Sequence, residues 1–87
     1  MKVVYKYPIV FEHEQSIFLP VDLKPLSVQL QDDVFCLWAL TDGESQLRFR
    51  QLWIIGTGHK EVEDNAEWIG TVQKGSYVWH FFLGPLI

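Results

Sequence analysis

The most suggestive chemical motif in the sequence is a short glycine-rich segment, Gly56-Thr57-Gly58-His59-Lys60. Its two glycines allow backbone N–H groups to approach an anion closely, and the histidine and lysine add polar and charged groups. The spacing matches neither the phosphate-binding loop of nucleotide hydrolases nor the dinucleotide-binding fingerprint. The segment is therefore interpreted in two ways: as a site for a nucleotide-like anion, assisted by Arg48 and Arg50, or as a wide turn that ends a long strand.

A second candidate is a surface rather than a motif. If the chain forms a hairpin at Asp42-Gly43, the two strands place Phe35 and Leu37 beside Arg48 and Arg50, on the face away from the core. An aromatic side chain next to two arginines suits the recognition of a protein, an anion or a base. In the alternative, the chain termini cover this face and the arginines extend outward.

Catalytic and metal-binding patterns are missing from the sequence. Cys36 falls in the middle of a predicted strand, on the expected core face, where a thiol is inert. The histidines, at positions 13, 59 and 80, lack the spacing of metal ligands, and the carboxylates fall in predicted turns and loops. We therefore expect no enzymatic activity, no catalytic residue, no metal and no cofactor.

The composition predicts one small folded domain over residues 1–87. The chain is 48% hydrophobic and includes four tryptophans, more than a thin core needs, so some aromatic side chains should lie at the surface and meet a partner. A net charge of −4 disfavours direct binding to nucleic acid and fits a partner protein with a basic patch. One cysteine, the lack of a secretory signal and the lack of a membrane-spanning run predict a cytoplasmic location without membrane contact.

Strand signals dominate the chain, in short β-branched and aromatic runs separated by proline, glycine, aspartate and asparagine. They predict an all-β fold, a small antiparallel sheet folded into a compact sandwich or partly open barrel of six to seven strands. The predicted strands lie near Val3–Tyr7, Ser16–Leu19, Leu26–Gln31, Val34–Leu40, Gln46–Ile55, Trp68–Gln73 and Tyr77–Leu83. The acidic segment 61–67 is expected to be a solvated loop rather than a helical turn.

Turn residues predict how three pairs of strands align. The segment Gln73-Lys74-Gly75-Ser76 predicts a hairpin in which Gly70 lies opposite Trp79 and the indole covers the bare glycine. The Asp42-Gly43 hairpin is expected to place Cys36 beside Phe49, and Trp38 beside Leu47, on the core face.

The hairpin near Asp32-Asp33 has two possible alignments. A two-residue turn would place Val28 and Leu30 on the face of Phe35 and Leu37. A three-residue loop pairs Leu30 with Val34 and Val28 with Cys36, and it gathers the apolar residues on one face, so we favour this loop. The apolar end of the chain, from Gly84 to Ile87, should pack either on the sheet or on a second subunit, and we expect a homo-oligomer.

Five segments, in order and over nearly the whole chain, carry a resemblance: Val4-Tyr5-Lys6-Tyr7-Pro8, Cys36-Leu37-Trp38-Ala39, Ile55-Gly56-Thr57-Gly58-His59, Ile69-Gly70-Thr71-Val72-Gln73 and Val78-Trp79-His80. Together they resemble a family of small uncharacterised proteins encoded by bacteriophages and bacterial genomes. Lys60 stands where that family usually has a proline, and the apolar tail after Phe82 is additional. The family implies no activity and no catalytic residue.

What the resemblance implies is a genomic setting. Short phage and prophage genes often encode proteins that bind host machinery and inhibit or divert it. The main functional prediction is therefore a non-enzymatic phage-type interaction protein that binds a host or defence protein in the host cytoplasm. The alternative is an oligomeric protein that binds or sequesters a small nucleotide-like anion.

Overall fold

The computed structural model describes residues 1–59 and 61–87, and in this part of the chain it contains seven β-strands and no helix. The strands are β1 (Lys2–Ile9), β2 (Glu14–Pro20), β3 (Lys24–Gln31), β4 (Val34–Asp42), β5 (Leu47–Gly56), β6 (Glu67–Lys74) and β7 (Tyr77–Leu86). Each strand coincides with one of the seven predicted segments, give or take a few residues at its ends. The all-β prediction is confirmed.

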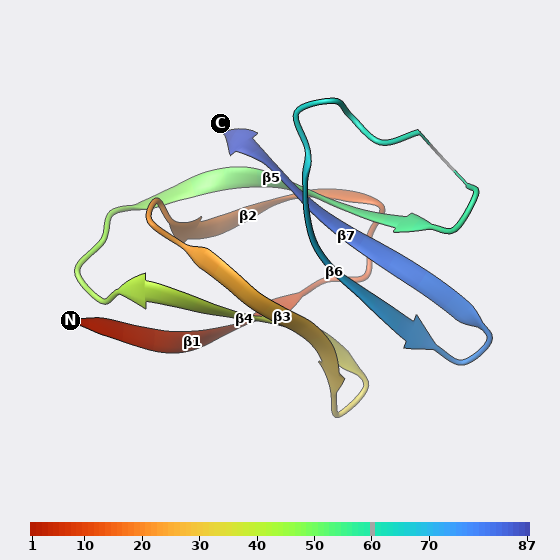
Figure 1. The fold of residues 1–87 in the computed structure, drawn as a ribbon, viewed down its shortest axis with the longest axis horizontal. Coiled ribbons are helices and arrows are strands. Elements are labelled where there is room, and N and C mark those ends of the chain that lie inside the picture. Colours follow the sequence, from red (N-terminus) through yellow and green to blue (C-terminus); the bar gives the residue numbers. More distant parts are fainter. Residues whose placement is uncertain (60) are drawn as a thin grey trace.

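The strands form two antiparallel sheets. One has three strands in the order β1-β4-β3, and the other has four strands in the order β2-β5-β7-β6 (Figure 1). The sheets are not hydrogen-bonded into a closed barrel, and the molecule measures only 16 Å along its shortest axis. Stacked sheets lie roughly 10 Å apart, so this thickness corresponds to two layers. Of the two predicted architectures, the structure is the sandwich.

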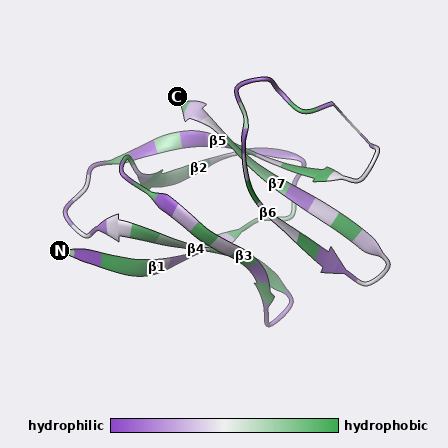
Figure 2. Ribbon diagram, in the orientation of Figure 1, coloured by the Kyte–Doolittle hydropathy of each residue, from purple (hydrophilic) through white to green (hydrophobic). Residues whose placement is uncertain are grey.

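The core lies between the sheets, where the two inner faces meet. Phe35 of β4 packs edge to face on Phe81 of β7, with ring centroids 5.0 Å apart. The same buried cluster includes Ile9, Leu19, Leu23, Val28, Leu37, Ala39, Leu52, Ile54, Ile69 and Leu83. Burying a large apolar side chain contributes roughly 1.5–3 kcal/mol, so this cluster is the main source of stability. Figure 2 shows the corresponding alternation of hydrophobic and hydrophilic residues along β3 and β7.

A two-residue turn at Asp32 and Asp33 joins β3 to β4, with φ angles of 51° and 65°. Two successive positive φ angles are typical of a type I′ turn, and aspartate is one of the few residues besides glycine that tolerate them. The turn pairs Leu30 with Phe35. The predicted three-residue loop, which paired Leu30 with Val34, is therefore wrong.

The alignment failed because β4 is apolar on both faces. Phe35 and Leu37 point into the core, while Cys36 is buried on the opposite face and Trp38 is half-buried there. β4 is the central strand of its sheet, between β1 and β3. A central strand with two apolar faces gives no period-two signal to distinguish neighbouring registers.

The chain turns after Asp42, but the predicted hairpin does not form. β4 already pairs with β1 on one side and β3 on the other, so β5 pairs with β2 and β7 in the other sheet. Gly43 does not have a positive φ, and the Asp42 carbonyl accepts the Ser45 N–H at 2.9 Å as the chain crosses between sheets. The predicted pairing of Cys36 with Phe49, and of Trp38 with Leu47, is therefore wrong.

A carboxylate fastens this crossing. Asp22, in the loop between β2 and β3, accepts hydrogen bonds from the Thr41 hydroxyl at 2.5 Å and from the Asp42 N–H at 2.8 Å. The bond from Thr41, followed by that from Asp42, favours the charged carboxylate and lowers the pKa of Asp22 to about 2. The β2–β3 loop and the end of β4 both lie where the chain crosses from one sheet to the other. The Asp22 side chain thus joins these two connections.

β6 and β7 form the second hairpin, two residues out of the predicted register. Gly75 and Ser76 occupy the centre of the turn, and the φ of 61° at Gly75 is one that glycine adopts without strain. Gly70 therefore pairs with Phe81 rather than with Trp79, and the predicted stacking of Trp79 on Gly70 is wrong.

A β-bulge at Ile69 changes which residues of β6 face inward. The register with β7 shifts between Trp68 and Gly70, so Ile69 turns into the core and Trp68 turns outward. An indole does cover a glycine elsewhere, because a β-carbon on Gly84 would lie 2.8 Å from Cη2 of Trp53. The predicted type of contact exists, but between other residues.

Candidate functional site

The predicted binding face does not exist as a surface. Phe35 is 2% exposed and Leu37 is fully buried, and both belong to the core. Arg48 and Arg50 lie on β5, in the other sheet. The prediction that these four residues share one outer face is wrong, because it depended on the absent hairpin at Asp42-Gly43.

The two arginines hold the end of the chain instead. Arg50 donates from Nε to the Gly84 carbonyl at 2.9 Å, and Arg48 donates from Nη2 to the Ile87 carbonyl at 3.3 Å. The Ile87 N–H in turn bonds to the Phe49 carbonyl at 2.9 Å. Of the two positions expected for the apolar tail, the structure has the one in which it packs on its own sheet.

The glycine-rich segment forms a tight turn. The His59 N–H bonds to the Gly56 carbonyl at 3.1 Å, and Gly58 has a φ of 76°, as in a type II turn. The Thr57 N–H points to the Val78 carbonyl at 3.4 Å, so two amides that an anion would need have acceptors within the chain. Lys60 lies outside the described residues.

One chain does not bring the two halves of the predicted anion site together. Arg48 lies near the start of β5, and Gly56 is its last residue. Eight residues of extended strand span about 26 Å at roughly 3.3 Å per residue. The anion-binding alternative therefore requires a second copy of the chain, and it stays a prediction.

The clearest apolar surface lies at one end of the four-stranded sheet. Phe18 of β2 pairs with Phe49 of β5 on the outer face, with ring centroids 4.8 Å apart, and Phe49 is 51% exposed. Leu47 precedes Phe49 by two residues and shares its face, while Ile87 is bonded beside Phe49. We call these four exposed residues, Phe18, Leu47, Phe49 and Ile87, the end patch.

The end patch was missed in the sequence because Phe49 was assigned to the core. Phe18 and Phe49 meet only through the pairing of β2 with β5, two strands that are separated by β3 and β4 along the chain. No local turn signals that pairing. Contiguous exposed apolar side chains of this kind are typical of protein-binding surfaces.

A second surface is the groove between β3 and β6, the facing edges of the two sheets. The strands run side by side in the same direction (Figure 1), and within the described chain no backbone hydrogen bond joins them. They enclose a groove of about 560 Å³ whose lining includes Lys24, Leu26, Glu67 and Trp68. Each strand carries a β-bulge there, at Leu26 and at Ile69.

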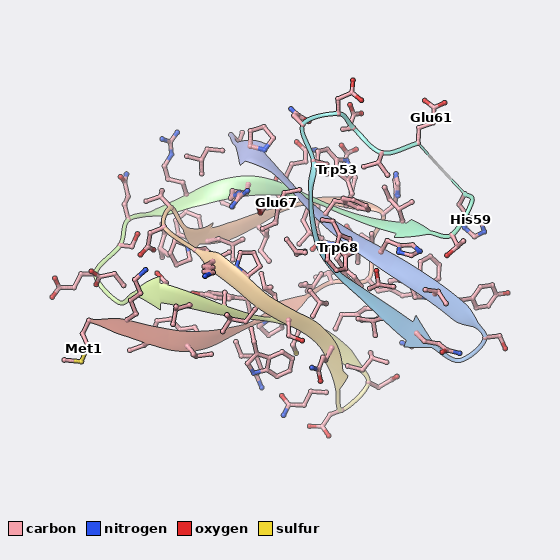
Figure 3. All side chains as sticks on the ribbon, in the orientation of Figure 1. Met1, Trp53, His59, Glu61, Glu67 and Trp68 are labelled. Atoms are coloured by element: carbon pink, nitrogen blue, oxygen red, sulfur yellow. The ribbon has the colours of Figure 1, made fainter. Side chains whose placement is uncertain are left out.

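Trp68 is the most prominent side chain of the groove, and Figure 3 shows it next to Glu67 at the start of β6. It is 61% exposed, yet its Nε1–H donates to Oγ1 of Thr71 at 3.0 Å. The ring of His80 bridges Thr71, 3.0 Å from Nδ1, and Thr57, 2.7 Å from Nε2. This chain of hydrogen bonds fixes the indole while leaving it open to solvent.

Within residues 1–59 and 61–87, the structure brings together neither a metal-binding site nor an activated nucleophile. No group of three or more histidine, cysteine, aspartate or glutamate side chains is placed there to hold a metal ion. The Cys36 thiol is buried and lies 3.6 Å from the Val34 carbonyl.

The fold and these surfaces define a small two-sheet β-sandwich that exposes apolar side chains at one end and along one groove. The model of a family described as a domain of unknown function, DUF7352, matches residues 1–86, and the chain belongs to that family. Comparisons with curated proteins and with solved structures found no match. The described residues contain no helix long and apolar enough to cross a membrane.

Proposed function

We propose that the protein is a non-enzymatic interaction protein of phage type, which binds a protein of the host cell or of its defence systems in the cytoplasm and inhibits it. The observation that carries the proposal is the end patch. Two phenylalanines in tilted contact, a leucine and an isoleucine are exposed to solvent in a chain whose core is small. Removing apolar surface from water contributes roughly 25 cal/mol per Å², so this patch favours burial against a partner.

Selective capture tests the proposal. Protein tagged at its N-terminus is incubated with lysates of bacteria that have intact defence systems, in parallel with a variant carrying Phe18→Ser and Phe49→Ser. We expect one polypeptide to co-purify with the wild type and to be lost with the variant. Val4→Ser is the matched control, because Val4 is also exposed but lies on β1, in the other sheet.

Two outcomes would contradict the proposal. One is the capture of the same polypeptide by the end-patch variant, and the other is an absence of any partner across the tested hosts. The inhibitory part is tested separately, by titrating the purified protein against the activity of the captured partner. Activity that stays constant under saturating binding would contradict inhibition.

A second copy of the chain is the competing occupant of the end patch. The predicted homo-oligomer stays a prediction, and light scattering over a concentration series tests it. A wild-type dimer that becomes a monomer with Phe49→Ser would assign the patch to self-association. A monomer at all concentrations leaves the patch available for a host protein.

A further inference from the structure

We infer that the groove between β3 and β6 docks a basic, extended segment of a partner protein, with an arginine or lysine side chain lying on Trp68 and its charge directed toward Glu67. The inference rests on the proposed function in that the partner is a protein. It concerns a different surface from the end patch and specifies the chemistry of the partner.

The environment of Trp68 selects a cation. Because Thr71 already accepts the indole N–H, a partner gains nothing by offering an acceptor such as a carboxylate or phosphate. The exposed π-face remains available, and tryptophan binds arginine and lysine more strongly than other aromatic rings do. Exposed tryptophans are also among the residues that contribute most to protein interfaces.

The charges around the groove also favour a positively charged partner. Glu67 lines the groove, and the segment 61–67 that leads into β6 contains four acidic residues and no basic one. The three acidic residues before Glu67 are exposed and lie in a loop that Figure 2 shows as mainly hydrophilic. Charges act over roughly 8–10 Å at physiological salt, so Glu67, which lies in the lining itself, attracts a basic segment and repels an acidic one, and the loop adds negative charge to the segment that leads into β6. Lys24 is the opposing charge in the lining.

The shape of the groove fits a side chain rather than an inserted strand. A β-carbon on Gly70 would lie 3.0 Å from Cβ of Val28, so the two edges touch there and leave no room for a strand between them. At the bulges, Leu26 is 51% exposed and offers an aliphatic wall opposite Trp68. Arginine and lysine have an apolar stem and a charged head, which match apolar walls beside a carboxylate.

A second copy of this chain is a poor occupant of the groove. In a two-fold symmetric dimer the same patch meets itself, so one interface would receive the negative charge of both acidic segments 61–67. Like charges across an interface oppose association. Charge complementarity therefore favours a basic partner.

Two synthetic peptides test the inference. One is a fluorescein-labelled nonapeptide of alternating arginine and serine, and the other has glutamate in place of each arginine. Fluorescence anisotropy with the full chain should show binding of the basic peptide only. We expect Trp68→Ala to weaken binding about five-fold or more, Glu67→Lys to weaken it further, and Lys24→Gln to strengthen it.

Further variants separate the groove from folding and from the end patch. Circular dichroism checks that each variant folds, and Glu67→Lys tests the groove without changing its apolar walls. Phe49→Ser should bind the basic peptide as the wild type does. Equal affinity for the two peptides, an unchanged affinity with Trp68→Ala, or self-association that depends on Trp68 would overturn the inference. If the protein does not bind the basic peptide but still captures a partner through the end patch, this inference alone is overturned. The proposed function then remains intact.

Discussion

Val28 of β3 lies directly against Gly70 of β6, so closely that a β-carbon at position 70 would come within 3.0 Å of both Cβ and Cγ2 of Val28. This contact is where the edges of the two sheets meet. Val28 belongs to the core, and the groove opens beyond it toward Leu26 and Trp68. One missing methyl group thus lets the sandwich close at this edge.

Gly70→Ala should therefore destabilise the protein by about 1–3 kcal/mol, as overpacking does in other cores. Denaturant unfolding measures the change. Gly43→Ala is the control, because its new β-carbon would lie 3.6 Å from Oη of Tyr5, an ordinary contact. We expect that variant to stay within about 0.5 kcal/mol of the wild type. Equal stability of the two variants would show that Val28 and Gly70 are not in close contact.

The hydrogen bonds to Asp22 predict a loss of stability in acid. Its pKa is about 2 in the folded protein and 3.8 when unperturbed. Since the folded-state pKa is the lower one, this stabilisation is complete above about pH 4 and is lost as the pH falls through about 2. Asp22→Asn should be less stable than the wild type at pH 7, and the difference should shrink between those two pH values.

Thermal unfolding from pH 7 to pH 2 measures this difference. Glu63→Gln, which removes an exposed carboxylate in the loop before β6, is the matched control and should follow the wild-type curve. If the difference in melting temperature between Asp22→Asn and the wild type stays constant from pH 7 to pH 2, the Asp22 carboxylate does not stabilise the two connections between the sheets.

The turn at Asp32 and Asp33 predicts a stabilising double substitution. Both residues have positive φ angles. Such angles are strained for a residue that has a β-carbon, but not for glycine. Asp32→Asn with Asp33→Gly should raise the stability by about 0.5–1 kcal/mol. The change removes the ion pair between Asp33 and Lys74, 3.4 Å apart, but an exposed pair contributes little.

Chemical denaturation and cross-strand nuclear Overhauser contacts check this turn. The contacts should join Leu30 to Phe35 in both proteins. Asp33→Ala is the comparison, because alanine keeps the strain and should not stabilise. A double variant less stable than wild type would indicate a different loop.

Cys36 should resist thiol reagents in the folded protein. It is 2% exposed, on the outer face of β4 between Pro8 and Gln29 on the neighbouring strands. Labelling therefore requires the sheet to open, and we expect the rate in native buffer to be at least about a hundred-fold below the rate in denaturant. Rapid labelling of the native protein would mean that β1 or β3 detaches readily.

The sequence was sufficient to place the strands but not to pair them. Runs of β-branched and aromatic residues are local signals, and all seven appear as strands. The pairings of β1 with β4 and of β2 with β5 join distant segments and leave no local trace. One misplaced hairpin at Asp42 exchanged the surroundings of two residues, so Phe35 was expected at the surface and Phe49 in the core.

The candidate surfaces were harder still to predict. Trp68 faces solvent because of the bulge at Ile69, and a bulge inserts one residue without altering the residue types around it. Residue type also does not separate an exposed phenylalanine such as Phe18 from a buried one such as Phe81. Only the strand order decides which of them lies between the sheets.

The bond between the Ile87 N–H and the Phe49 carbonyl has a practical consequence for screening. Residues fused after Ile87 would emerge within the end patch, beside Phe49, and shield it, while Met1 is fully exposed on β1's side of the molecule. Bait proteins for interaction screens should therefore be joined at the amino terminus, and a negative screen with a carboxy-terminal fusion would carry no weight.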